Sequence, residues 1–270
     1  QTLAAQTINL SGSQTSASSI RLSAAQGDVN LIGATISASQ TLTANAGRTL
    51  RTDNAKISAT QINASANDLS NAHGEIIQVG SGDMTLNLPG NLDNTQGKIA
   101  ASGNAAVTAD NLNNTQGQIT ADQALSVGTA QALANAQGIL AASRQVSVSG
   151  SRIDNVQGTI GSVRGAASVT ATSAGLDNTA GRIEAAQAVN ISSVGLTNAG
   201  GVITGSSLTL DSQAQAFDNT RGKLATTGAA DSGALNIQSG ALNNEAGLIQ
   251  AHGALVIDTH GQTLANTNSG

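Results

Sequence analysis

A repeated unit of 20 to 25 residues occupies most of the chain and constrains its fold more than any other feature. Each copy begins with Leu, Ile or Phe and has Asn two residues later. Nine of the ten copies have Gly three residues after the Asn, and the nine complete copies have Ile or Leu two residues after that. The copies start at Leu69, Leu92, Leu112, Leu133, Ile153, Leu176, Leu196, Phe217, Leu242 and Leu264. Such an array predicts a solenoid, in which each unit packs mainly against its two neighbours.

The first 68 residues lack the Asn column but keep the same period. INLSGSQTSA from Ile8 aligns with VNLIGATISA from Val29, 21 residues further on, and ISASQ at Ile36 aligns in the same way with ISATQ at Ile57. We therefore predict two segments of one continuous solenoid. Residues 1–68 form coils of a divergent subtype, and residues 69–270 form coils of the L-x-N-x-x-G-x-I subtype.

Apolar residues alternate with polar ones inside each unit. Val146 shares its parity with Val148, and Leu208 with Leu210. A period of two indicates strands, and Gly, Asn, Asp and Ser punctuate about three of them per unit. Three short strands in about 21 residues are typical of one turn of a parallel β-helix. The predicted fold is all-β, a single-stranded parallel β-helix of about 13 coils.

Composition agrees with a narrow core and disfavours several functions. The 270 residues include one Phe, no Trp or Tyr, and 31 Gly. Eleven scattered cations and a net charge of −5 disfavour nucleic acid as a partner. No apolar run is long enough to predict a membrane span, and the absence of Cys excludes disulfides and thiolate sites. Both ends fall inside the repeat, so we interpret the chain as an internal segment and expect the isolated chain to associate end to end.

The Asn column is the most regular candidate site. Its parity places it inward or at a turn, where stacked amides can donate to one coil and accept from another, as in cross-β stacks. The alternative is a row of Asn that binds a ligand. We predict a structural ladder and expect the following Gly to supply a positive φ. Its members are Asn71, Asn94, Asn114, Asn135, Asn155, Asn178, Asn198, Asn219, Asn244 and Asn266.

Other candidate sites have weaker patterns. Asp154 and Asp177 occupy one column in successive units, as a carbohydrate-active enzyme would require. The same column also holds Asn, Thr and Ala, which favours turn chemistry. His252, Asp258 and His260 match no zinc spacing, and Gly80 to Asp83 is a poor match to a calcium nonapeptide. We predict no catalytic residue, no metal site and no cofactor.

The unit L-x-N-x-x-G-x-I-x-A resembles the haemagglutinin/adhesin repeats of two-partner-secreted exoproteins, which include filamentous haemagglutinin and contact-dependent growth-inhibition effectors. The resemblance covers residues 69–270 well and residues 1–68 more loosely. It implies a right-handed β-helix, export through an outer-membrane two-partner secretion transporter, and a location on the cell surface of a Gram-negative bacterium or in its medium.

The sequence and the resemblance together favour a non-enzymatic stalk that extends a binding or toxin module from the bacterial surface. The alternative from another class is a lateral-face adhesin module that binds a host or bacterial cell-surface receptor directly. A carbohydrate-active β-helix enzyme is the third hypothesis, disfavoured because the chain has no cation cluster, aromatic wall or long loop.

Overall fold

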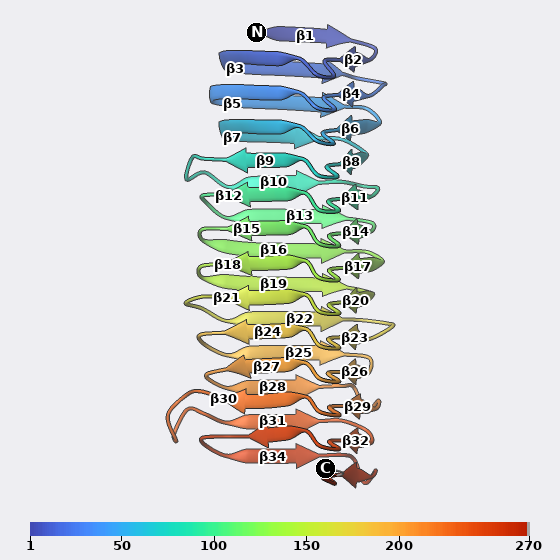
Figure 1. Cartoon of the computed structure of the whole chain (residues 1–270), viewed down its shortest axis with the longest axis vertical. Helices are drawn as coiled ribbons and strands as arrows, with labels where there is room; N and C mark the ends of the chain where they lie inside the picture. Colours follow the sequence, from blue (N-terminus) through green and yellow to red (C-terminus); the bar gives the residue numbers. More distant parts are fainter. Residues whose placement is uncertain (269–270) are drawn as a thin grey trace. The chain divides into compact units, whose positions relative to one another are not determined.

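The computed structural model describes residues 1–268. The chain divides into two compact units, residues 1–130 and residues 131–270. All regular elements in the described part are β-strands, and each unit is a stack of coils (Figure 1). The predicted fold class is confirmed: the chain is an all-β, right-handed parallel β-solenoid with about 13 turns of about 21 residues. The described residues contain no helix long and apolar enough to span a membrane.

Unit 1 has one short strand per coil and longer strands between the short ones. The short strands are β2 (Ile8–Asn9), β4 (Val29–Asn30), β6 (Thr49–Arg51), β8 (Asp68–Ser70), β11 (Leu92–Asp93) and β14 (Leu112–Asn113). The others are β1 (Thr2–Ala5), β3 (Gln14–Ala24), β5 (Thr35–Ala46), β7 (Lys56–Ser65), β9 (Glu75–Gln78), β10 (Met84–Asn87), β12 (Lys98–Ala101), β13 (Ala105–Ala109), β15 (Gln118–Ala121) and β16 (Ala124–Thr129).

Unit 2 repeats the three-strand coil throughout. Its short strands are β17 (Ala132–Ala134), β20 (Arg152–Asp154), β23 (Leu176–Asp177), β26 (Leu196–Thr197), β29 (Phe217–Asp218), β32 (Leu242–Asn243) and β35 (Leu264–Ala265). The others are β18 (Ile139–Ala142), β19 (Gln145–Gly150), β21 (Thr159–Ser162), β22 (Ala167–Ala171), β24 (Arg182–Ala185), β25 (Val189–Ser193), β27 (Val202–Gly205), β28 (Leu208–Asp211), β30 (Lys223–Thr226), β31 (Leu235–Gln238), β33 (Leu248–Gln250) and β34 (Leu255–Asp258).

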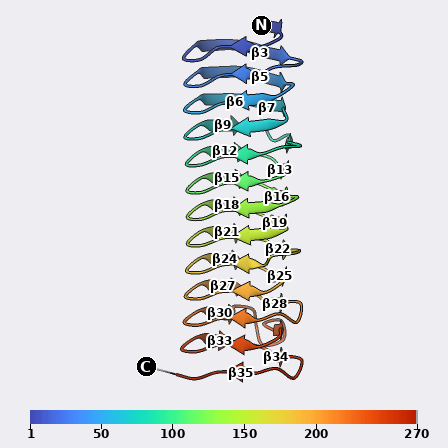
Figure 2. The same cartoon turned by 90° about the vertical axis from the view of Figure 1, so that its right-hand side faces the viewer.

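Parallel pairing between successive coils builds the ladders of each unit, three of them wherever a coil has three strands. In unit 2 the short strands pair in series from β17 to β35, while β18 and β19 each begin a ladder of their own. Figure 2, turned by a quarter from Figure 1, shows the coils of each unit following one another at even spacing. Each coil returns to the same register because the rest of the coil serves as the crossover that parallel strands need.

The core of each unit is a stack of inward-facing aliphatic side chains. Met84 and Leu86 in β10 are fully buried, whereas the alternating Thr85 and Asn87 are exposed. Phe217 is 1 % exposed and pairs in register with Leu196 and Leu242, so it stands in the column otherwise filled by Leu and Ile. The additional residues of this coil form the turn after β30, which projects outward as expected (Figure 1).

The two coil subtypes differ at one corner. In the first coils β3 and β5 run through the corner as single strands, with a register shift between Ala17 and Ser19 where the two pair. From β9 onward a turn divides the corresponding segment into two strands. Turn-forming residues such as Gly103 and Asn104 occupy these later corners, whereas Ser18 and Thr60 stand at the earlier ones. Three strands per coil are therefore found only from β8 onward.

Pairing inside unit 1 continues across the predicted boundary at residues 68 and 69. Leu69 in β8 pairs with Leu50 of β6 on one side and with Leu92 of β11 on the other. The change of subtype therefore takes place within a stacked ladder of unit 1.

Candidate functional site

The Asn column lies at the turn between each short strand and the next strand. After β11 the chain turns from Asn94 to Gly97, and the Gly97 N–H donates to the Asn94 carbonyl at 3.0 Å. The Asn94 side chain also donates through Nδ2 to the Gly97 carbonyl at 3.3 Å. Because Asn94 has the same parity as Leu92, its side chain points into the coil, where it is 0 % exposed.

The side-chain amides are linked from coil to coil within each unit. In unit 1, Nδ2 of Asn71 donates to Oδ1 of Asn94, and Nδ2 of Asn94 donates to Oδ1 of Asn114, both at 2.7 Å. In unit 2 the same bond, at 2.6 to 2.7 Å, connects each member to the next, in the order Asn135, Asn155, Asn178, Asn198, Asn219, Asn244 and Asn266. Every one of these bonds points the same way along the chain, which lets successive amides polarise one another.

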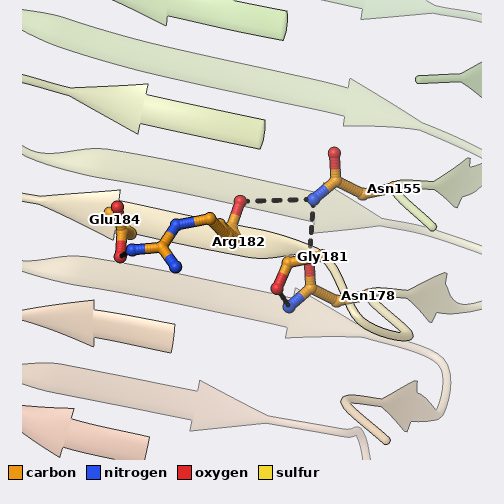
Figure 3. Close-up of polar contacts among 5 residues, drawn as sticks. All are labelled: Asn155, Asn178, Gly181, Arg182 and Glu184. Carbon is orange, nitrogen blue, oxygen red and sulfur yellow. Dashed lines mark hydrogen bonds and ion pairs between the residues drawn. The ribbon is translucent and has the colours of Figure 1, made fainter. Parts of the chain in front are cut away.

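Figure 3 shows one step of the ladder. Asn155 donates to Oδ1 of Asn178 and also to the carbonyl of Arg182 at 3.3 Å, while Asn178 donates to the carbonyl of Gly181. The Arg182 guanidinium lies outside the coil and pairs with Glu184. Asn155, an interior member, therefore bonds both to the next coil and to its own turn.

The ends of the described ladder differ from its interior. In the coil before Asn71, Thr52 stands two residues after Leu50, is fully buried, and donates its hydroxyl to Oδ1 of Asn71 at 2.8 Å. Asn266 in the last described coil is exposed. Thr52 thus belongs to the site, although the sequence analysis missed it. Its position two residues after Leu50 was the available signal.

The Gly column acts differently from our expectation. The positive φ falls on the preceding residue, for example 55° at Gln96 and 53° at Ala180, and not on the Gly itself. A Cβ on Gly97 would lie 2.2 Å from the Asn71 carbonyl oxygen and 2.6 Å from Oδ1 of Asn94. Glycine is required because the ladder and the preceding coil occupy the space of a side chain, so the prediction of its role was wrong.

The column that follows the first Leu provides turn chemistry. Oδ1 of Asp177 accepts from the Thr179 N–H at 2.9 Å and from its hydroxyl at 2.6 Å, and Asp154 accepts from the Val156 N–H at 3.0 Å. Asp154 and Asp177 lie opposite each other in the ladder. Both carboxylates thus bind their own turns, as short polar side chains do at such positions.

Two of the three histidines, His252 and His260, also bind backbone. Nδ1 of His252 lies 3.1 Å from the Gly228 carbonyl oxygen, and Nδ1 of His260 lies 2.9 Å from that of Ser239. His252 thereby ties the turn after β30 to the next coil, a role not apparent from the sequence. Among residues 1–268, no three His, Cys, Asp or Glu side chains are grouped as a metal ion would require.

A shallow groove of about 290 Å³ lies on the side of unit 2. Gly175 and Gly195, with positive φ angles of 86° and 82°, are among its lining residues. Arg152 and Asp177 stand beside them. The groove thus brings a guanidinium, a carboxylate and glycine backbone together.

The coil geometry and the buried amide ladder define a repeat β-solenoid protein. Haemagglutinin repeats are recognised over residues 2–33, 23–95, 79–135, 125–166, 162–231 and 214–270, and the chain belongs to the haemagglutinin repeat family. Over 117 residues, 41% of this chain, it is 45% identical to the protein named Toxin CdiA from Yersinia pestis. That match spans 4% of the relative's length. No solved structure matches the chain.

Proposed function

We propose that this chain is a non-enzymatic stalk segment of a large secreted filament on the surface of a Gram-negative bacterium. The observation that carries the proposal is the buried amide ladder. Its interior members, such as Asn178, are 0 % exposed and have their hydrogen bonds inside the stack. The most regular polar residues of the chain therefore serve coil stacking and are closed to a ligand.

Repetition suits a stalk for a physical reason. Each coil adds a row of parallel backbone hydrogen bonds and one further amide, so stability depends mainly on neighbouring coils and the length can grow without a larger core. Coils are spaced at roughly 4.8 Å, so each repeat of about 21 residues adds a fixed increment of length. In this proposal residues 1–68 and 69–270 act as one continuous solenoid.

The relationship to Toxin CdiA supports a place within a much longer exoprotein. The proposal therefore includes export through an outer-membrane two-partner secretion transporter and a binding or toxin module carried elsewhere in the parent. A host or bacterial cell-surface receptor would be the partner of that module.

Direct lateral binding is the second candidate function, and the groove beside Arg152 is the observation that favours it. A guanidinium, a carboxylate and glycine backbone in one groove suit a small hydrogen-bonding group on a receptor. The third hypothesis, a carbohydrate-active enzyme, has less support because Asp154 and Asp177 are engaged by their own turns.

A cell-binding assay separates the two leading functions. The labelled chain is titrated onto host and bacterial cells, alone and fused to a module of known receptor specificity. The stalk proposal predicts that only the fusion binds. Saturable binding of the chain alone that is lost in Arg152→Ala and kept in Arg164→Ala, a control in the same unit outside the groove, would replace it with the adhesin function.

A further inference from the structure

The change of coil subtype in unit 1 interrupts the backbone ladder at one place. The first half of β7 pairs with β9, from Lys56 opposite Glu75 to Ala59 opposite Gln78. The second half pairs with β10 only from Ala64 opposite Leu86. One coil earlier, β5 and β7 are already paired at Thr41 and Gln61. Residues 61–63 thus lack the ladder partners that the preceding coil has.

The register identifies the bond that is missing. Ala64 opposite Leu86 places Ile62 opposite Met84, two residues earlier. In the next coil Met84 pairs with Ala105, and the Met84 N–H donates to the carbonyl of Asn104, the residue before Ala105, at 2.9 Å. The N–H at this position therefore donates to the residue that precedes its ladder partner. The Ile62 N–H should therefore donate to the carbonyl of Asp83.

Two glutamine side chains replace that bond. The Ile62 N–H donates to Oε1 of Gln78 at 2.9 Å, and Nε2 of Gln78 donates to the Gly82 carbonyl at 2.6 Å. The Asp83 carbonyl accepts from Nε2 of Gln61 at 3.0 Å. Backbone groups on both sides of the interruption thus obtain partners, as buried backbone requires.

The surrounding residues are matched to this arrangement. Gln78 is 0 % exposed in a column that holds Ala59 one coil before and Ala101 one coil after, both small and buried. A Cβ on Gly82 would lie 2.4 Å from Oε1 of Gln61, so the glycine leaves room for that side chain. The string from Gly80 to Asp83, a poor match to a calcium motif, lies in the turn that this pair binds.

We propose that Gln61 and Gln78, the junction pair, are the device that joins the two coil subtypes into one hydrogen-bonded stack. Gln78 is the ladder partner of Ile62, and Gln61 anchors the turn of residues 79–83 to β7. The pair allows the chain to switch from a bulged continuous strand to two strands with a turn while keeping buried backbone groups bonded. This inference does not depend on the proposed stalk function.

Native-state hydrogen exchange on the 270-residue chain tests the proposal. Loss of the Oε1 acceptor of the buried Ile62 N–H should raise the exchange rate of the Ile62 amide roughly tenfold or more in Gln78→Ala. Alanine is the residue that neighbouring coils carry in this column, so the variant should fold. The Val107 amide in β13 should be unchanged, and Gln118→Ala, an exposed glutamine in β15, is the matched control.

Gln61→Ala separates the two roles. In this variant the exchange rate of the Ile62 amide should stay within about twofold of its rate in the unmodified chain. Limited proteolysis at residues 79–83 should become faster, because local protection follows local bonding. Unchanged Ile62 exchange in Gln78→Ala would overturn the proposal. Equal loss of Ile62 protection in both variants would also overturn it, because fraying of the whole turn would then explain the result.

Discussion

Replacing Asn178 with Leu tests whether the amide ladder stabilises the solenoid. Asn178 is fully buried, accepts from Asn155 and donates to Asn198, each at 2.7 Å. A scale based on hydrophobicity alone would predict a gain in stability, because Leu adds apolar area to a buried position. The ladder predicts a loss.

The expected loss follows from the partners that remain. Asn155 keeps its bonds to the carbonyls of Gly158 and Arg182, and the Gly181 carbonyl still accepts from Val202. The substitution removes the bond that Oδ1 of Asn198 accepts from Asn178, and an orphaned buried acceptor costs about 1–3 kcal/mol. Leu methyl groups at positions that accommodate 2.7 Å contacts are overpacked, which costs about 1–3 kcal/mol more. We therefore expect a loss of about 3 kcal/mol in the free energy of unfolding.

Chemical denaturation with hydrogen exchange provides the measurement, and Asn266→Leu is the control. Asn266 is exposed, and the substitution removes only the bond that it accepts from Asn244. Asn244 keeps its bond to the Gly247 carbonyl, so the control should change stability by less than about 0.5 kcal/mol. Exchange protection in residues 1–68 should be unchanged in both variants because repeat energetics are local. Equal stability of Asn178→Leu and the unmodified chain would refute the stabilising role of the ladder.

Two further predictions concern the turns, and a third concerns Asp68 at the start of β8. Gly97→Ala should destabilise the chain by more than about 2 kcal/mol in denaturation experiments. The control is Gly161→Ala, whose added Cβ meets nothing closer than 3.7 Å; it should be neutral or stabilise by up to about 1 kcal/mol. Equal effects of the two substitutions would contradict the steric role of the Gly column. Ala180→Gly should be neutral or slightly stabilising in the same assay, because it relieves a left-handed alanine that costs about 1–2 kcal/mol; a clear loss would contradict this. Asp68 has a pKa below its ordinary value, chiefly because its carboxylate accepts from the Asn91 N–H, with burial opposing. Its contribution should be present above the unfolded-state pKa and disappear as pH falls through the lower folded-state pKa, so Asp68→Asn should flatten stability against pH in that acidic range; an unchanged profile would count against it.

The two parts of the site differ in how far sequence reasoning reached. The positions of the Asn column and its inward parity follow from spacing alone, because every coil returns the chain to the same register. The function of the Gly column does not follow from spacing. A glycine required for a positive φ and a glycine required because a neighbouring atom leaves no room for a Cβ look identical in a sequence. Only the distance from the Gly97 Cβ position to Asn71, a residue 26 positions earlier, separates the two.

The sequence by itself determined the period, the strands and the identity of the core columns, because these depend on local alternation repeated many times. Tertiary structure decided the features that depend on contacts between unlike coils. Thr52 begins the ladder only because Asn71 lies beside it in the next coil. His252 binds the turn after β30 through Gly228, a residue 24 positions earlier. Gln78 is needed because the coil before it follows a different path through the corner. A repeated sequence predicts the structural features that all coils have in common. The contacts at a junction depend on the residues that differ between two adjacent coils.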